Sequence, residues 1–287
     1  RGTSIIFITH KLREVQAAAD RITIIRRGKV VGTALPSATQ EELAAQMVGR
    51  PVDLTLTKKP AVIGSNVLSI SNLRVIDNTG RELLHSVSLD VRAGEIVAVA
   101  GVQGNGQSEL ARAILNLEEH VSGKILIDGK NIVGETVRNS LHSGIAFIPE
   151  SRELDGLIGS FSIAENLILD THDLEPVAKR GQINKEYVRE NAIKLVKEFD
   201  VRTQSIFDTS SSLSGGNKQK VVLARELSRN VELVIASQPT RGLDVGSIEF
   251  VYQRLMAERA ANRAVLLISS ELDEVSALAD RIAVIYR

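Results

Sequence analysis

Short, continuous apolar runs alternate along the chain with segments in which apolar residues recur at helical spacing. The apolar runs predict buried strands at residues 4–9, 95–100, 231–236 and 264–269. The helical spacing predicts helices at residues 11–19, 41–48, 108–117, 185–199, 218–227 and 248–258. Strands that are apolar throughout are typical of parallel sheets covered on both faces, so the pattern predicts an α/β fold with a largely parallel sheet.

Other stretches follow different patterns. Residues 67–92 alternate like antiparallel strands around a turn at 77–80, and residues 21–25 and 29–33 predict a hairpin that turns at Arg27 and Gly28. Residues 151–212 are more polar. Residues 51–65 mix Pro, Thr, Lys and Gly without periodicity, which indicates a linker.

An internal repeat divides the chain. Residues 8–25 and 268–285 match without a gap at a constant offset of 260, and ten of the eighteen positions are identical. We therefore expect a fragment of a longer tandem protein. Its parts are the end of a first unit at residues 1–49, a linker at 50–65, and most of a second unit at 66–287, with a more helical region at about 151–213.

Composition excludes several classes of function. The 287 residues include 35 Lys and Arg against 35 Asp and Glu, which argues against nucleic-acid binding through a generally basic surface. The absence of Cys excludes disulfides and Cys-ligated metals. No apolar run approaches the roughly 18 residues that a membrane helix needs.

A glycine-rich loop follows the strand predicted at 95–100 and opens a helix. Its spacing matches the phosphate loop G-x4-G-K-[ST], and its nucleotide-binding candidates are Gly101, Gly104, Asn105, Gly106, Gln107 and Ser108. Glycines let backbone N–H groups face phosphates, and the helix N-terminus adds a favourable dipole. Gln107 replaces the lysine and brings no charge, whereas Ser108 remains available as a Mg²⁺ ligand. An ordinary strand–turn–helix connection has the same pattern.

A second glycine pair lies directly before the helix predicted at 218–227. Ser214, Gly215 and Gly216 place a hydroxyl and flexible backbone at a helix N-terminus, which suits an anion. The segment from Leu213 to Lys220 resembles the signature motif of ABC-type ATPases. The resemblance covers the whole chain. It implies a P-loop ABC-type ATPase fold with a parallel sheet core, an antiparallel β subdomain and a helical subdomain, and it implies ATP and Mg²⁺ as cofactors.

Further segments are similar to other motifs of that family. Residues 231–236 resemble the Walker B strand, and residues 239–244 resemble the segment that leads into the D-loop. Glu150 falls at the Q-loop, and His10 matches the switch histidine of the first domain. The resemblance adds Glu150, Ser214, Gly215, Gly216, Gln219 and Asp244 to the nucleotide-binding candidates.

Five positions of the second domain depart from the family's catalytic pattern. Gln107 replaces the phosphate-loop Lys, Ser237 the Walker B Asp, Gln238 the catalytic Glu, Ser270 the switch His, and Glu150 the Q-loop Gln. Phosphoryl transfer depends on neutralising phosphate charge, placing Mg²⁺ and orienting water. Val75 and Ile76 also stand where an adenine-stacking aromatic is expected. We therefore expect this domain's own site to bind nucleotide weakly or without hydrolysis.

The intact signature indicates a different role for this domain. The resemblance implies cassettes that pair head to tail, so residues 213–219 would complete a catalytic site on the first domain, where His10 would sense the γ-phosphate. Gln238 and Ser270 would be degenerate catalytic positions. The whole protein would hydrolyse ATP, and this chain alone would be weakly active or inactive.

Within the family, residues 104–107 and 237–246 are similar to tandem ATP-binding subunits of bacterial sugar and nucleoside importers. The Gln238-Pro239-Thr240 variant is most similar to the nucleoside, basic-membrane-lipoprotein type. Such subunits lie on the cytoplasmic face of the cell membrane, bind permease subunits, and serve a substrate-binding lipoprotein indirectly. Two alternatives remain: a soluble tandem ABC ATPase not coupled to transport, and a non-catalytic regulatory module.

Overall fold

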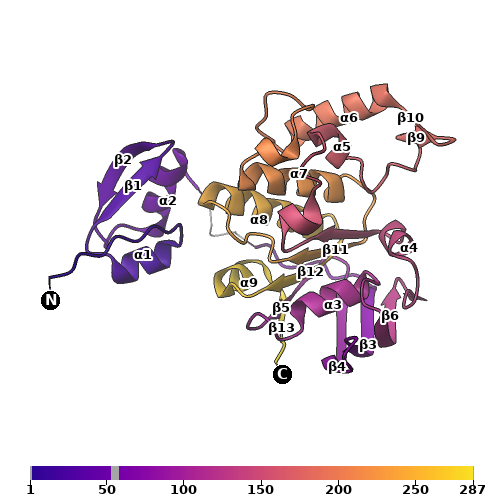
Figure 1. Cartoon of the computed structure of the whole chain (residues 1–287). Helices are drawn as coiled ribbons and strands as arrows, with labels where there is room; N and C mark the ends of the chain where they lie inside the picture. Colours follow the sequence, from indigo (N-terminus) through magenta and orange to yellow (C-terminus); the bar gives the residue numbers. More distant parts are fainter. Residues whose placement is uncertain (1, 53–57, 287) are drawn as a thin grey trace.

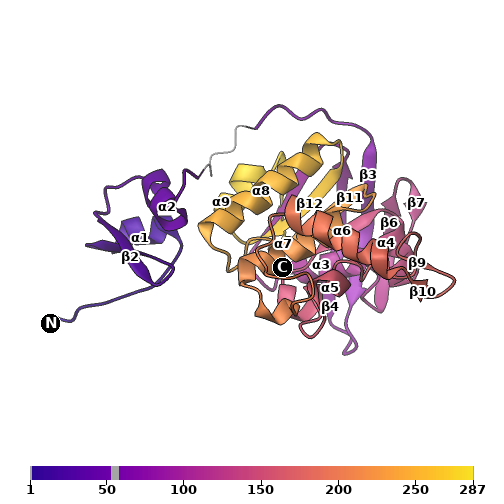
Figure 2. The same cartoon turned by 90° about the horizontal axis from the view of Figure 1, so that it is seen from above.

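The computed structural model describes residues 2–52 and 58–286. Residues 2–52, here called the N-terminal piece, lie beside a larger main lobe formed by residues 58–286 (Figures 1 and 2). The N-terminal piece contains α1 (Leu12–Ala18), β1 (Ile22–Arg26), β2 (Lys29–Ala34) and α2 (Gln40–Val48). The predicted hairpin is confirmed, because β1 and β2 pair antiparallel and Arg27 and Gly28 adopt positive φ at its tip.

A five-stranded parallel sheet forms the centre of the main lobe. Its strand order is β13 (Arg281–Val284), β5 (Ile96–Ala100), β12 (Ala264–Ser269), β11 (Leu233–Ser237) and β8 (Ile145–Ile148). Alternate residues of β5, β8, β11 and β12 enter different cores. Val234 and Ala236 of β11 pack on one face, whereas Leu233 and Ile235 pack on the other. Both faces are covered, which explains the continuous apolar runs of the sequence.

One face of this sheet packs against α3 (Gln107–Ile114) and an antiparallel sheet. That sheet has the order β4 (Glu82–Arg92), β3 (Asn66–Ile76), β6 (His120–Ile127) and β7 (Lys130–Asn131). The antiparallel strands predicted at residues 67–92 are therefore confirmed. The short helix α4 (Val137–His142) leads into β8.

The other face of the sheet packs against three helices and a more helical region. The three helices are α7 (Gly215–Leu227), α8 (Val245–Ala260) and α9 (Leu272–Leu278). The more helical region contains the π-helix η1 (Arg152–Gly156), α5 (Ile163–Asn166), β9 (Ala178–Lys179), β10 (Gln182–Ile183), α6 (Lys185–Glu198) and the 3-10 turn η2 (Ser210–Ser212). Figure 1 shows α5, α6 and the β9–β10 hairpin together at one end of the main lobe.

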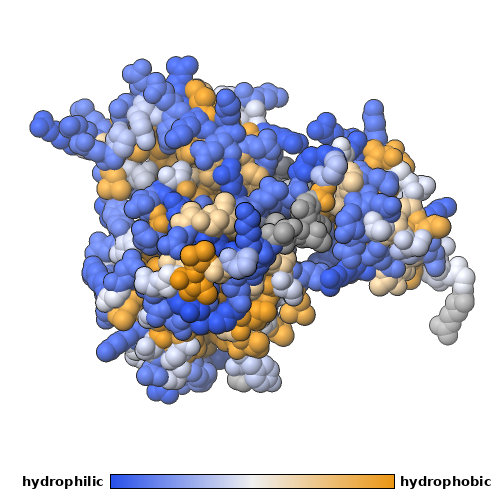
Figure 3. Space-filling model, turned by 180° about the vertical axis from the view of Figure 1, so that it is seen from behind, coloured by the Kyte–Doolittle hydropathy of each residue, from blue (hydrophilic) through white to orange (hydrophobic). Residues whose placement is uncertain are grey.

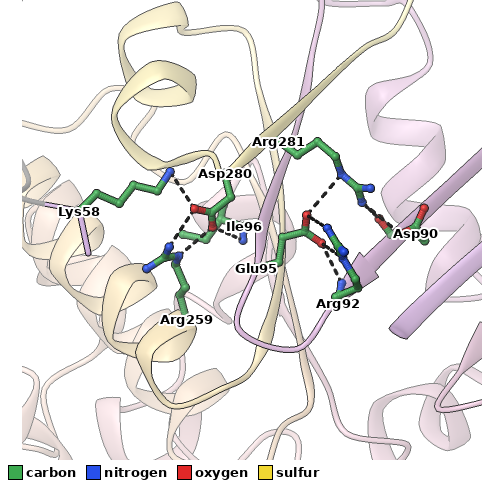
Figure 4. Close-up of polar contacts among 8 residues, drawn as sticks. All are labelled: Lys58, Asp90, Arg92, Glu95, Ile96, Arg259, Asp280 and Arg281. Carbon is green, nitrogen blue, oxygen red and sulfur yellow. Dashed lines mark hydrogen bonds and ion pairs between the residues drawn. The ribbon is translucent and has the colours of Figure 1, made fainter. Parts of the chain in front are cut away.

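A partly buried polar network joins β13 to the start of β5 (Figure 4). Asp280 accepts hydrogen bonds from the Ile96 amide (2.9 Å) and from the Arg259 guanidinium (2.7 and 2.8 Å), and it pairs with Lys58 at 3.1 Å. Burial alone would raise the pKa of Asp280, but these donors outweigh it and lower the pKa. Beside it, Glu95 pairs with Arg92 and Arg281.

The internal repeat is also a structural repeat. At the offset of 260, α1 and α9 have the same bounds and the same length of seven residues, and each is followed by a strand. The residues before the two helices also agree: Lys11 has φ −82° and ψ 100°, and Glu271 has φ −87° and ψ 106°.

The strand predicted at residues 4–9 is not formed. Its equivalent, β12, lies between β5 and β11, whereas no strand of the described residues lies beside residues 4–9. A strand needs a partner for its backbone hydrogen bonds. The apolar side chains are therefore exposed, with Ile5, Ile6 and Ile8 at 84, 92 and 99%. Figure 3 shows other hydrophobic atoms on the surface of the N-terminal piece.

Several helix boundaries differ from those predicted, three of them by three residues. The helix expected at 108–117 ends at Ile114, whereas α7 and α8 begin three residues earlier than expected, at Gly215 and Val245. The linker predicted at 50–65 falls partly on residues 53–57, outside the described residues. Among the described residues, no helix combines the length and the apolar character that crossing a membrane requires.

Candidate functional site

Three loops meet at the carboxyl edge of the parallel sheet. They follow β5, β12 and β11, which are adjacent, with Ala100 in register with Ser269 and Ile268 in register with Ser237. The phosphate loop follows β5, Gln238 follows β11, and Ser270 follows β12. The carboxyl edge of an open α/β sheet is the usual ligand site of such folds.

The phosphate loop has the backbone geometry that its glycines predict. Gly104 and Gly106 adopt φ of +90° and +98°, a region that favours glycine. A Cβ on Gly106 would lie 2.6 Å from Leu84 Cδ2, so a larger residue would also collide with β4. The loop leads directly into the N-terminus of α3, which suits an anionic group.

Gln107 occupies the lysine position of the loop. Its side chain is 4% exposed, and both its amide oxygen and its amide nitrogen lack hydrogen-bond partners among the described residues. An unpaired buried amide costs free energy. The group can therefore gain hydrogen bonds from a ligand, but it supplies no positive charge to a phosphate.

Ser108 lies in a cluster that already contains a cation. Its hydroxyl donates to Glu150 at 3.4 Å, Gln103 donates to the same carboxylate at 3.1 Å, and the Arg241 guanidinium forms a direct ion pair with it. Arg241 and Glu150 come from different loops, and Arg152 donates to the Arg241 carbonyl at 2.9 Å.

The residues around Ser108 do not fit Mg²⁺. This ion prefers several oxygen ligands with carboxylate charge. Glu150 supplies such a carboxylate, but Arg241 neutralises it, and Ser237 stands where a second would be. Within residues 2–52 and 58–286 there is also no group of three His, Cys, Asp or Glu side chains suited to a metal.

Gln238 and Ser270 bind each other across the ends of β11 and β12. Gln238 Nε2 donates to Ser270 Oγ at 3.1 Å, and the Ser270 amide donates to Gln238 Oε1 at 3.3 Å. Gln238 has a φ of 47°, which is uncommon for a residue other than glycine. Two of the predicted catalytic positions are thus in contact, and their polar atoms are used for each other.

A buried acid, Glu274, binds Thr240, which lies two residues after Gln238. Glu274 of α9 is 1% exposed and accepts a hydrogen bond from Thr240 Oγ1 at 2.8 Å. Burial raises its pKa to about 7, although hydrogen bonds from Ser269 and Thr240 oppose the rise. No motif in the sequence marks Glu274, although it is one of the identical positions of the repeat.

The predicted signature residues lie at the start of α7. Ser214 precedes α7, and its hydroxyl accepts a hydrogen bond from Asn217 Nδ2 at 3.0 Å. Gly215 and Gly216 form the first turn, where substituents would meet other loops: a Cβ on Gly215 would lie 2.9 Å from Arg152 Nη2, and one on Gly216 would lie 2.2 Å from Ser247 Oγ. Close packing therefore requires a glycine at position 216, whereas the flexible Arg152 side chain could move away from a substituent at position 215.

Asp244 and Gln219 lie on the two helices next to the predicted signature, Asp244 exposed and Gln219 buried. Asp244 caps α8, because its carboxylate accepts hydrogen bonds from the Ser247 amide (3.0 Å) and hydroxyl (2.8 Å). Gln219 is 2% exposed on α7.

The far end of α7 is held by a buried charged network. Arg225 donates to Glu226 (2.9 Å) and to the Gly156 carbonyl (2.8 Å). Glu226 accepts the Phe147 amide of β8 at 3.0 Å, and Arg229 donates to Glu226 at 2.8 Å. Burial raises the pKa of Glu226. These contacts join α7 to the sheet and to η1.

Two sequence predictions concern positions outside these clusters. His10 lies two residues before α1 in the N-terminal piece, and Ser270 lies two residues before α9 in the main lobe. Val75 is fully buried in β3, so it offers no surface for an adenine ring, whereas Ile76 is 40% exposed.

Arg241, Arg152 and Thr240 were not among the predicted site residues. Arg241 and Thr240 lie within the recognised segment 239–244, but the pairing of Arg241 with Glu150 joins positions 91 residues apart. No local signal in the sequence links Arg241 to Glu150.

Comparison with known proteins agrees with this geometry. The family model described as ABC transporter matches residues 84–241. The nucleoside import ATP-binding protein NupA of Lactococcus lactis is 47% identical over 99% of this chain and 56% of its own length. The guanosine import ATP-binding protein NupO of Bacillus subtilis is 46% identical over the same shares. The glucose import ATP-binding protein TsgD13 of Haloferax volcanii is 41% identical, over 99% of this chain and 52% of its own length.

The chain thus spans about half the length of the curated relatives that it matches. Among solved structures, a nucleotide-free ATP-binding cassette from an ABC transporter superposes with a TM-score of 0.65 at 22% identity, over 77% of this chain and 88% of the other. The predicted combination of parallel sheet, antiparallel sheet and helical region is therefore confirmed as the cassette fold. The chain belongs to the ABC transporter ATPase family.

Proposed function

We propose that the whole protein is the ATP-binding, energy-coupling subunit of an importer. Residues 1–49 would end its first nucleotide-binding domain, residues 50–65 would link the two domains, and residues 66–287 would form the second. It would lie at the cytoplasmic face of the cell membrane on permease subunits, and a substrate-binding lipoprotein would deliver the cargo. Nucleosides are favoured as cargo over simple sugars, because the two relatives at 47 and 46% identity are nucleoside and guanosine import proteins.

We further propose that the second domain holds a degenerate site and completes a catalytic site on the first. One contrast within the main lobe carries this proposal. At the phosphate loop the groups expected to act on ATP are replaced or bind each other, as Gln238 and Ser270 do. At the start of α7, Ser214, Gly215 and Gly216 retain the signature.

The role of Mg²⁺ follows from the same contrast. The chemistry around Ser108 disfavours the ion there, so the metal of the whole protein would belong to the catalytic site on the first domain. At the degenerate site, Ser108, Gln107 and the loop amides would bind phosphate oxygens, and Arg241 would supply positive charge after leaving Glu150. Gly101, Gly104, Asn105 and Gly106 would contribute backbone to the same contacts.

The test uses the chain extended upstream by the rest of the first domain. Its Mg²⁺-dependent ATP hydrolysis is measured with and without Ser214→Arg, which places a bulky cation at the signature. We expect the substitution to abolish hydrolysis. Thr209→Arg, at an exposed position five residues earlier, is the matched control and should retain it. Hydrolysis that survives Ser214→Arg would exclude residues 213–219 from the working site.

A further inference from the structure

The N-terminal piece and the main lobe touch through residues that are equivalent in the repeat. Lys11 Nζ lies 3.1 Å from Glu271 Oε1, and Arg13 Nη1 lies 2.5 Å from Asp273 Oδ1. Both pairs join residues that are 260 positions apart, which is the offset of the repeat. Figures 1 and 2 show α9 on the side of the main lobe that faces the N-terminal piece.

Contact between equivalent residues is typical of a two-fold arrangement. Near a two-fold axis, a position on one unit meets the same position on the other. The starts of α1 and α9 are therefore related by an approximate two-fold axis. In an arrangement of identical units, each charged residue near such an axis would face its own copy and repel it.

Here the charges at the two positions have opposite sign. The N-terminal piece carries Lys11 and Arg13, and the main lobe carries Glu271 and Asp273. We propose that the opposite charges of these four residues favour pairing of the N-terminal piece with a main lobe over pairing of two main lobes. A second copy of the main lobe in the same place would set Glu271 against Glu271 and Asp273 against Asp273.

The helix dipoles support this interpretation. The start of a helix favours acidic side chains, so Glu271 and Asp273 suit α9. Lys11 and Arg13 stand at the start of α1, where their own helix disfavours them. Lys11 has one acid of its own helix nearby, Glu14, at 3.9 Å. The favourable interactions of the two bases therefore come largely from across the contact.

Other contacts between the N-terminal piece and the main lobe do not involve these four charged residues. Val245 of α8 packs in one apolar cluster with Leu43, Ala44 and Val52. Arg50 also pairs with Glu249 at 2.7 Å. The side chains of the four charged residues are 45 to 70% exposed, which suits a role in the choice of partner more than in overall stability.

The test measures the distance between the two parts of the full 287-residue chain. Because the chain lacks Cys, spin labels can be attached at Lys29→Cys and Ala261→Cys, both at exposed positions. Four forms are compared: the unchanged charges, Lys11→Glu with Arg13→Asp, Glu271→Lys with Asp273→Arg, and all four reversals together. A fifth form, Arg138→Asp, disrupts the exposed Arg138–Asp173 pair elsewhere in the main lobe.

We expect a narrow distance distribution for the unchanged chain and for the fourfold reversal. Each one-sided reversal should broaden it, with roughly a tenfold fall in the ratio of closed to open forms at low salt. Salt at 1 M should reduce that difference, because it shortens the screening length to about 3 Å. Arg138→Asp should leave the distribution unchanged.

The proposal is overturned if all five forms give one distribution, if the fourfold reversal stays as open as the one-sided forms, or if Arg138→Asp opens the chain equally. The readout is a distance and does not involve ATP hydrolysis. A failure here would therefore leave the proposed transport function standing, and a failure of that function would leave this test valid.

Discussion

The amide of Gln238 and the hydroxyl of Ser270 satisfy each other at the ends of two neighbouring strands, with 3.1 Å between Nε2 and Oγ. In the proposed tandem protein, the position equivalent to Ser270 in the first domain is His10. One position would thus act on phosphate in one domain and hold a neighbouring side chain in the other.

The first prediction compares these equivalent positions in the chain extended upstream. His10→Ala should lower ATP hydrolysis by about a hundredfold or more, the effect expected for a group that acts directly on the reaction. Ser270→Ala should change the rate less than twofold and should lower the free energy of unfolding by about 1 kcal/mol, because Gln238 loses a partner. Steady-state hydrolysis and urea unfolding provide the two measurements. Equal losses of activity would contradict the proposal of one catalytic site.

The second prediction concerns charge at the phosphate loop. Gln107→Lys should tighten ATP binding to this chain by roughly tenfold, because it restores a charge-assisted contact with phosphate. Chelating Mg²⁺ should change the dissociation constant of the unchanged chain less than twofold. Titration with a fluorescent ATP analogue measures both effects.

The matched control for that prediction is Val102→Lys, which adds the same charge at a position of the loop that is 75% exposed. It should tighten binding much less. If both lysines act equally, general attraction by the added charge explains the gain. If chelation weakens binding strongly, the exclusion of Mg²⁺ from Ser108 is wrong.

The third prediction concerns pH. The pKa of Glu274 is about 7 in the folded protein and near 4.5 in the unfolded chain. Between these values the folded protein retains a proton that the unfolded chain releases. The free energy of unfolding should therefore fall by about 3 kcal/mol as the pH rises from 4.5 through 7, and it should stay low above that pH.

Glu274→Gln should remove this dependence while keeping an acceptor for Thr240. Urea unfolding at pH 5, 6, 7 and 8 should give a flatter profile and a higher stability at pH 8 than for the unchanged chain. Glu190→Gln, on the exposed face of α6, should keep the original profile. Parallel profiles for the unchanged chain and Glu274→Gln would assign the pH dependence to another group.

The fourth prediction compares two carboxylates shown in Figure 4. Asp280→Asn should lower the free energy of unfolding by about 3 kcal/mol, because the buried Arg259 guanidinium loses its charged partner. Asp90→Asn, whose partner Arg281 is 40% exposed, should cost less than about 0.5 kcal/mol. Chemical denaturation measures both, and similar losses would show that burial does not set the difference.

The sequence predicted much of the fold because its strongest signals are local. The buried strands that follow from apolar runs, the hairpin at Arg27 and Gly28, and the phosphate loop all depend on neighbouring residues. The segment at residues 4–9 has the same local signal but forms no strand, because a strand also depends on partners that are distant in sequence. A local apolar pattern favours a strand, but pairing with neighbouring strands determines whether the strand forms.

The sequence motifs name candidate residues of the site, but they do not show which of these residues pair. Gln107, Gln238 and Ser270 were recognised as departures, yet the bond between the last two depends on the order of β11 and β12 in the sheet. Arg241 reaches Glu150 from another loop, and Asp280 reaches Arg259 from another element. Such contacts depend on topology, which single-sequence periodicity does not contain.

The buried charged network fixes the C-terminal end of α7, so a rotation about that end would displace the N-terminal end of the helix. Arg225 and Glu226 anchor one end to β8 and η1, whereas the signature lies at the opposite end, about ten residues away. At 1.5 Å per residue this is an arm of ~15 Å. A tilt of about 10° around the anchor would move Gly215 by ~2.6 Å. That displacement nearly equals the length of a hydrogen bond, so a small rotation about the anchored end would be enough to make or break the proposed contact with a phosphate.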